Sequence, residues 1–195
     1  MEEIAYIGDI SKNDASVLAR LASGALRILE FGPGASTQVM RHHASDETQM
    51  ISTDHNQEWL DHQNGLLSEV GVKGVVQFVN YKSWRQVARS LAPYDLILDD
   101  GDDSLRFDFA IGAWDLLAVG GTLLFHDTRR YWEPHCDVQN VCRFIFTKWA
   151  DIERVDINVD DSNLTAIVKG SRRSYVNWNE VEGRTAHQAG YDPVG

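Results

Sequence analysis

An apolar, strand-like run that ends in two glycines is the first feature of the sequence with chemical meaning. The run LRILEF, at 26–31, is followed by Gly32 and Gly34 and then by the hydroxyl residues Ser36 and Thr37. Glycine permits backbone conformations that are closed to residues with a Cβ, and it lets a ligand approach the main chain closely. A plain strand-to-helix turn normally needs only one glycine, so this segment favours a ligand-binding turn.

Two acids narrow the kind of ligand. Asp54 stands 20 residues after Gly34, at the end of the next expected strand, where a carboxylate can accept both hydroxyls of a ribose. The fingerprint of dinucleotide-binding turns requires a third glycine where this chain has Thr37. Glu30 lies just before the turn and would repel a diphosphate, whereas it suits an ammonium or sulfonium group. The pattern therefore predicts a nucleoside ligand with a positive centre.

A second set of candidate residues follows two later strand-like runs. YDLILDD, at 94–100, ends in Asp100, and GTLLFHD, at 121–127, ends in His126 and Asp127. Ligands of parallel α/β sheets bind at the carboxyl ends of the strands, so we expect these side chains at the reacting centre, as a general base or as groups that orient an acceptor. Alternatively, Asp100 and Asp127 hold Mg²⁺, which prefers oxygen ligands.

The elements that must position these residues follow from the hydrophobic pattern. Short apolar runs alternate with stretches of helical period, which is typical of parallel strands joined by crossover helices. The expected strands are 26–31, 50–54, 75–79, 94–100 and 121–127. The last expected helix, 138–149, presents an apolar stripe of Val138, Val141, Cys142, Ile145, Phe146 and Trp149.

The pattern changes after this helix. An alternating run, a polar turn and a further apolar run over 152–169 predict an antiparallel hairpin. From residue 171 the chain turns polar and loses its apolar period. We therefore expect one α/β domain over 1–170 and a polar C-terminal tail or arm over 171–195, through which the chain would form a homo-oligomer.

Composition excludes several classes of protein. The chain has 195 residues, of which 43% are hydrophobic, which suits one globular domain. Its net charge of −11 has the wrong sign for a protein that binds nucleic acid by neutralising phosphates. No long apolar run or secretion leader is visible, so we expect a cytoplasmic protein without a membrane partner. Cys136 and Cys142 have no zinc-ligand spacing and are expected to be reduced thiols.

Taken together, these motifs resemble those of the class I S-adenosylmethionine-dependent methyltransferases. The first motif of that family is an acid, any residue and then a glycine-rich turn, which Glu30, Gly32 and Gly34 match, with Ser36 in place of the third glycine. The variant E-x-G-x-G-x-S-T, together with D-G-D and H-D, resembles a subgroup that methylates small molecules. The resemblance implies a Rossmann-like, doubly wound, mostly parallel sheet that ends in an antiparallel hairpin, as expected for 152–169.

The resemblance also implies roles for individual residues. Glu30 would orient the methionine end of the cofactor, Gly32, Gly34 and Ser36 would pass against it, and Asp54 would hold its ribose. After the third strand, Ser83 would offer its backbone amide to the adenine and Trp84 would stack on it. Asp99 would complete the cofactor site at the end of the fourth strand.

The leading expectation is a methyltransferase that uses S-adenosylmethionine, and Mg²⁺ in the alternative noted above, to methylate a small-molecule acceptor at oxygen. A methyl group on a sulfonium is already activated, so most of the acceleration would come from positioning. A second hypothesis is a non-catalytic module that binds the cofactor or a partner. A third is a nicotinamide-dependent oxidoreductase, which rests only on the glycine turn and Asp54.

Overall fold

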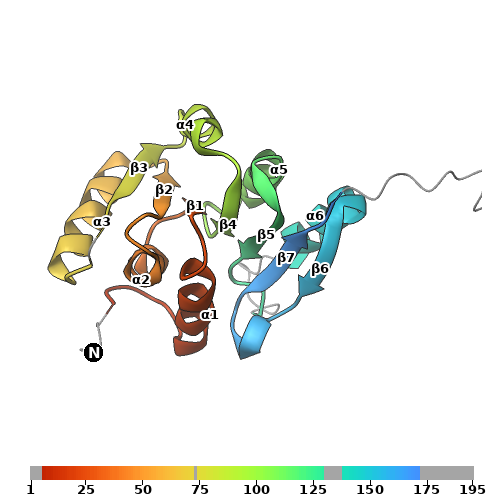
Figure 1. Cartoon of the computed structure of the whole chain (residues 1–195), viewed down its shortest axis with the longest axis horizontal. Coiled ribbons are helices and arrows are strands. Elements are labelled where there is room, and N and C mark those ends of the chain that lie inside the picture. The colour runs from red at the N-terminus through yellow and green to blue at the C-terminus, as the bar shows by residue number, and fades with distance from the viewer. Residues whose placement is uncertain (1–5, 73, 130–137, 172–195) are drawn as a thin grey trace, which may run out of the picture.

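The computed structural model describes residues 6–72, 74–129 and 138–171, drawn in colour in Figure 1. The strands are β1 (Arg27–Phe31), β2 (Gln49–Asp54), β3 (Val76–Asn80), β4 (Tyr94–Asp99), β5 (Leu117–Phe125), β6 (Ile152–Asp156) and β7 (Thr165–Lys169). The helices are α1 (Lys12–Ala22), α2 (Ala35–His43), α3 (Gln57–Glu69), α4 (Trp84–Leu91), α5 (Arg106–Trp114) and α6 (Val138–Lys148), with short 3-10 turns η1 (Trp149–Asp151) and η2 (Val159–Asp161).

All seven strands form one sheet in the order β3-β2-β1-β4-β5-β7-β6. The pairs from β3 to β5 are parallel, and β7 pairs antiparallel with both β5 and β6. The order reverses between β1 and β4, which is the position where ligands bind in doubly wound sheets. The predicted α/β class, the five parallel strands and the terminal hairpin are confirmed.

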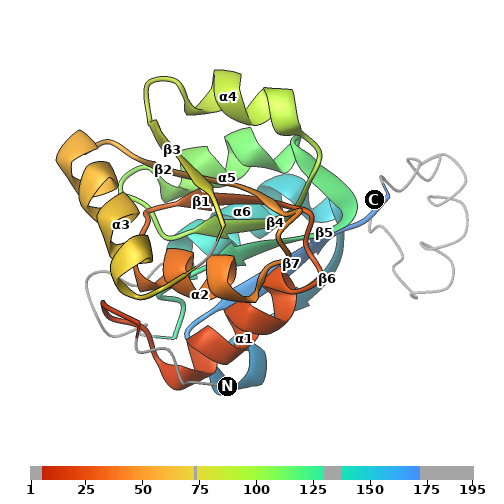
Figure 2. The same ribbon diagram turned by 60° about the vertical axis from the view of Figure 1, so that its left-hand side comes forward.

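Helices cover both faces of the sheet, and Figure 2 shows α4 and α5 on one side and α1 and α2 on the other. One buried cluster, which includes Trp84, Phe109 and Trp114, packs beneath α4, α5 and α6. The other, which includes Leu18 and Met40, packs beneath α1, α2 and α3. Two apolar layers explain why the central strands are apolar along their whole length.

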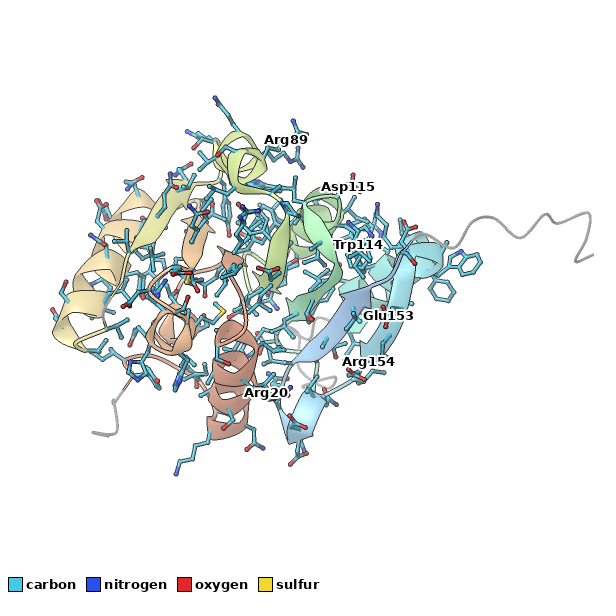
Figure 3. All side chains as sticks on the ribbon, viewed as in Figure 1. Arg20, Arg89, Trp114, Asp115, Glu153 and Arg154 are labelled. Carbon is cyan, nitrogen blue, oxygen red and sulfur yellow. The ribbon has the colours of Figure 1, made fainter. Side chains whose placement is uncertain are left out.

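The apolar stripe predicted on the last helix is wrong in detail. Val141 of α6 is buried, but Phe146 and Trp149 are 83% and 62% exposed, and Cys142 is also exposed. Phe144 of α6 packs into the core instead. Its ring centroid lies 5.1 Å from that of Trp114, a residue labelled in Figure 3. Val141 and Phe144 thus reach the core and Ile145 packs against it, whereas Cys142, Phe146 and Trp149 stay exposed.

The hairpin is tied to the first helix. Arg20 of α1 lies 2.6 Å from the carboxylate of Asp160 in η2, and Figure 3 labels Arg20 between α1 and the hairpin. Asn163, in the turn that leads to β7, donates its backbone N–H to Asp14 of α1 over 2.6 Å. These contacts bring the C-terminal hairpin beside the carboxyl ends of β4 and β5.

Two predictions fall outside the described residues. Cys136 and the tail beyond residue 171 are not described, so the tail and its role in self-association stay predictions. No helix among residues 6–72, 74–129 and 138–171 combines the length and the apolar character needed to cross a bilayer.

Candidate active site

The glycine turn connects β1 to α2 at the edge where β4 also ends. Gly32 has a φ of +81°, and a Cβ at this position would overlap the backbone oxygen of Asp100. Only glycine accepts both the left-handed backbone and this close approach. Gly34 donates its N–H to Thr37 Oγ1 over 3.0 Å, and α2 begins at the next residue. The turn therefore lies directly against the loop that carries Asp100.

Glu30 holds the glycine turn from beneath. Its fully buried carboxylate accepts hydrogen bonds from Ser36 Oγ at 2.6 Å, Thr37 Oγ1 at 2.7 Å and Ser52 Oγ at 2.6 Å. Burial raises the pKa of Glu30 to about 7, although the three hydroxyls lower it in part. Because these hydroxyls occupy the carboxylate, Glu30 fixes the turn to β1 and β2, whereas the sequence analysis expected it to orient a ligand.

The first of two adjoining cavities passes over the turn and has a volume of about 300 Å³. Three segments line it: the N-terminal segment Ile7–Ile10, the turn from Gly32 to Ser36, and α3 through Trp59, His62, Gln63 and Leu66. Asp100 and His126, which follow the ends of β4 and β5, also line it. The N-terminal segment is held by the side chain of Gln38, which exchanges two 2.9 Å hydrogen bonds with the backbone of Ile7. The cavity is therefore enclosed by the turn on one side and by the start of the chain on the other.

The second cavity, of about 750 Å³, opens from the same place toward α1 and the hairpin. It shares Asp9, Ile10, Asp100 and His126 with the first cavity. The rest of its lining is polar: Ser11, Lys12, Asn13, Asp14, Asp127, Arg129, Asp161 and Asn163. The two cavities thus meet at Asp100 and His126, two of the residues predicted to act on the substrates.

His126 lies between carboxylates from different elements. Its Nδ1 is 3.0 Å from Asp100 Oδ1, and its Nε2 is 3.7 Å from Asp14 Oδ2. Burial alone would lower the pKa of His126, but the bonds to Asp100 and Asp14 and the charge of Asp127 outweigh burial and raise it to about 10. At neutral pH the imidazole is therefore a cation that donates hydrogen bonds.

Asp14 is the partner of His126 that sequence reasoning missed. It is 3% exposed and accepts hydrogen bonds from Ser11 Oγ and from the backbone N–H of Asn163, each at 2.6 Å. Burial would raise the pKa of Asp14, but the bonds from His126, Ser11 and Asn163 lower it to about 2. The carboxylate is therefore charged at all ordinary pH values and balances the charge of His126.

Arg106 joins the two acidic loops. Its side chain is 5% exposed, and its NH2 lies 3.1 Å from Asp100 Oδ1 and 3.5 Å from Asp127 Oδ2. Its Nε donates to the backbone oxygen of Gly101 and its NH1 to that of His126. Asp127 has a φ of 58°, a left-handed conformation, and also accepts a bond of 2.9 Å from Asn163 Nδ2. One guanidinium thus fixes both loops and supplies their counter-charge.

Ligand atoms of Asp100, His126 and Asp127 all lie within 4.8 Å of one another, a spacing at which three groups can share a metal ion. The charges around them argue against one. Arg106 NH2 already contacts the two carboxylates, so a divalent ion would meet the positive charge of a buried guanidinium. The residues as they stand do not fit Mg²⁺.

Besides Glu30, four predicted cofactor residues lie outside both cavities. Asp54 Oδ1 accepts the N–H of Asn56 at 2.8 Å and lies 3.3 Å from His55 Nδ1, so it caps the loop before α3. Asp99 is fully buried. The other two are Ser83, the N-cap of α4, and Trp84, its first residue, which were predicted to contact the adenine.

The two residues predicted to contact the adenine are engaged within the fold. The backbone N–H of Ser83 donates to Asn80 O at 2.9 Å, so it is not available to a ring. Trp84 is 4% exposed and packs edge-on against Phe31, with centroids 4.9 Å apart. Trp84 is thus the first core residue of the hydrophobic stripe of α4, and its role at the adenine stays a prediction.

Comparison with known proteins decides the family. A family model described as a methyltransferase domain matches residues 29–128, a range that holds the glycine turn and both acidic loops. The chain belongs to this family of methyltransferases. The resemblance predicted from the motifs is confirmed, and the oxidoreductase alternative is not supported. No curated protein matches the chain in sequence.

Solved structures of this methyltransferase fold are similar over most of the chain. An O-methyltransferase from Bacillus cereus, in complex with SAH, is 18% identical with a TM-score of 0.66 and covers 84% of each chain. A putative O-methyltransferase from Klebsiella pneumoniae is 21% identical with a TM-score of 0.66, over 84% of this chain and 82% of that one. The O-methyltransferase TomG from Streptomyces achromogenes, in complex with SAM, is 17% identical with a TM-score of 0.66, over 88% and 84%.

Proposed function

We propose that this methyltransferase transfers the methyl group of S-adenosylmethionine to a hydroxyl oxygen of a small-molecule acceptor. The observation that carries the proposal is the meeting of two cavities at Asp100 and His126, one bounded by the glycine turn and the other lined by polar groups. A methyl donor and its acceptor must approach each other on one line, which two cavities with a common end permit. The similar proteins from Bacillus cereus and Streptomyces achromogenes, crystallised with SAH and SAM, support this cofactor.

The cofactor, when bound, supplies a methyl group already activated on a sulfonium, so the protein contributes mainly position and charge. Holding two reactants in attack geometry contributes on the order of 7 to 11 kcal/mol. Near the end that the cavities share, the three carboxylates of Asp14, Asp100 and Asp127 outnumber the two cations Arg106 and His126. The excess of negative charge favours a positive sulfonium over an anionic ligand. The same charge disfavours phosphate-bearing acceptors and supports the expectation that nucleic acid is not the substrate.

Asp100 is our proposed general base. Its Oδ1 is fixed by Arg106 and His126, and no contact of its Oδ2 is found among the described residues. The free oxygen is available to accept the proton that an acceptor hydroxyl loses on methylation. A positioned base contributes about 10²- to 10⁴-fold in rate, so its removal should slow the reaction without abolishing cofactor binding.

His126 has a different role from the base that the sequence analysis allowed. A protonated imidazole has no lone pair to accept the acceptor's proton, so we assign His126 to orienting Asp100 and stabilising its charge. Asp14 and Asp127 in turn stabilise the imidazolium. Asp127, expected as a third catalytic group, is held by Arg106 and Asn163 and lines the second cavity, where the acceptor would bind.

We propose that the transfer needs no metal ion. Arg106 and His126 supply positive charge at the place where Asp100 and Asp127 would otherwise bind Mg²⁺. In this proposal Arg106 and His126, and not Mg²⁺, balance the negative charge of Asp100 and Asp127.

The proposal can be tested with S-adenosylmethionine that carries a ¹³C-labelled methyl group. The purified full chain is incubated with this cofactor and a metabolite extract, and products are examined by mass spectrometry. We expect a labelled small molecule that gains one methyl group, and its formation should be slowed in an Asp100→Asn variant. Cofactor binding without any labelled product would favour the non-catalytic hypothesis instead.

A further inference from the structure

Of two buried glutamines, Gln38 bonds to Ile7 at the first cavity and Gln63 lines that cavity, and only Gln38 has its hydrogen bonds satisfied. Gln38 of α2 is fully buried and uses both its oxygen and its nitrogen on the backbone of Ile7. Gln63 of α3 is 2% exposed, and its Oε1 has no hydrogen-bond partner among the described residues. An unsatisfied buried carboxamide costs about 1 to 3 kcal/mol, so a native protein retains one where a ligand completes its bonds.

The position of Gln63 identifies the kind of ligand group that it would meet. Gln63 lines the first cavity together with Ala35 and Ser36, the first residues of α2. The first backbone N–H groups of a helix have no partner within the helix and attract carboxylates. A carboxamide beside such a helix end offers one acceptor and one donor, which match an ammonium and a carboxylate on the same carbon.

The lining of the first cavity indicates which end of the cofactor it would hold, the nucleoside or the amino acid. Asp54, the residue expected to hold the ribose, does not line the first cavity, whereas Asp100 and His126 do. With the ribose at Asp54, as the family resemblance implies, the nucleoside would lie outside this cavity and the amino-acid end of the cofactor would occupy its interior. The cavity's volume of about 300 Å³ suits part of such a ligand.

We propose that Gln63 binds the amino-acid head of S-adenosylmethionine, accepting from its ammonium group and donating to its carboxylate. This inference rests on the proposed function, because it assumes that cofactor. It assigns a binding role to a residue on α3 that no motif in the sequence marks. It also explains why a buried amide is kept on an apolar face between Leu60 and Leu66.

The test compares two ligands that differ only in this head. Calorimetry is performed with S-adenosylhomocysteine, which has the amino-acid head, and with 5′-methylthioadenosine, which lacks it. In a Gln63→Leu variant we expect S-adenosylhomocysteine to bind at least about tenfold more weakly, while the affinity for 5′-methylthioadenosine changes less than twofold. The matched control is Gln57→Leu, the same substitution on the exposed face of α3, which should leave both affinities unchanged.

The stability of the ligand-free protein separates binding from a structural role. Removing an unsatisfied amide should leave the melting temperature of Gln63→Leu at or above that of the wild type. If the leucine variant does not fold, Gln63→Met, of similar length, provides the same comparison. Equal losses for both ligands, or binding of S-adenosylhomocysteine within twofold of the wild type, would overturn the inference. If the wild type itself does not bind S-adenosylhomocysteine, the proposed function fails, and this inference fails with it.

Discussion

His126 Nδ1 lies 3.0 Å from Asp100 Oδ1, so the ends of β5 and β4 are joined at the point where the two cavities meet. The contact orients one oxygen of Asp100 and leaves the other for a substrate. It also keeps His126 protonated, which makes the carboxylate, and not the imidazole, the group able to accept a proton.

Replacing Asp100 by Asn should lower the rate of methyl transfer by about 100-fold or more, because an amide cannot take the acceptor's proton. Single-turnover kinetics with a labelled cofactor measure this rate. Affinity for S-adenosylhomocysteine, whose sulfur is uncharged, should change little, since the amide still accepts from Arg106. Asp108→Asn, an exposed acid on the same helix as Arg106, is the control and should retain full activity; an equal loss there would remove the assignment of Asp100.

Replacing Arg106 by Met should destabilise the fold by about 3 kcal/mol, because two partly buried carboxylates lose their counter-charge. Arg106→Lys should recover only part of this, since an ammonium group cannot reproduce the four-way contact of the guanidinium. Urea unfolding measures both values. Arg20→Met, which removes the exposed pair with Asp160, should cost less than about 1 kcal/mol. Similar losses for the Arg106 and Arg20 variants would show that the two loops are not held by Arg106.

Glu30 predicts how the free energy of unfolding depends on pH. Its pKa in the folded chain is raised to about 7 from an ordinary value of 4.5, so the folded state binds the proton more tightly than the unfolded state. The stabilisation is fully present below pH 4.5 and is lost as the pH rises through 7, by about 3 kcal/mol in total. Urea unfolding between pH 4.5 and 8 measures it. Glu30→Gln should flatten the profile between pH 4.5 and 6.5, and an unchanged slope there would contradict the raised pKa of Glu30. Above pH 6.5 a decline remains in this variant, because the pKa of His126 is also raised.

Chelation of divalent cations should not change the rate of methyl transfer. Arg106 and His126 already neutralise Asp100 and Asp127, so EDTA removes nothing that the reaction uses. Initial rates with and without EDTA, and with added Mg²⁺, give the comparison. A loss of activity with EDTA that Mg²⁺ restores would show that the metal displaces Arg106.

The sequence could predict the glycine turn, the strand ends and the hairpin, because each depends on local composition and period. It could not predict that Asp14 and Arg106 contact His126 or that Asn163 contacts Asp14 and Asp127, since charged and polar residues on helices and turns look the same whether they face water or a neighbour. It also placed Phe146 and Trp149 in the core, because a helical stripe indicates one apolar face but not how much of it the sheet covers. In both cases, contacts between segments that are distant in the sequence determine which side chains are buried.

Calorimetric titration of S-adenosylhomocysteine into the purified full chain tests the central claim most directly. The account predicts one site per chain, with binding that weakens when Ser36, at the start of α2, is replaced by Asp, which places a negative charge beside Glu30. It also predicts no binding of NADH under the same conditions. Absence of any heat with S-adenosylhomocysteine, or equal binding by the Ser36→Asp variant, would contradict a cofactor site at the glycine turn.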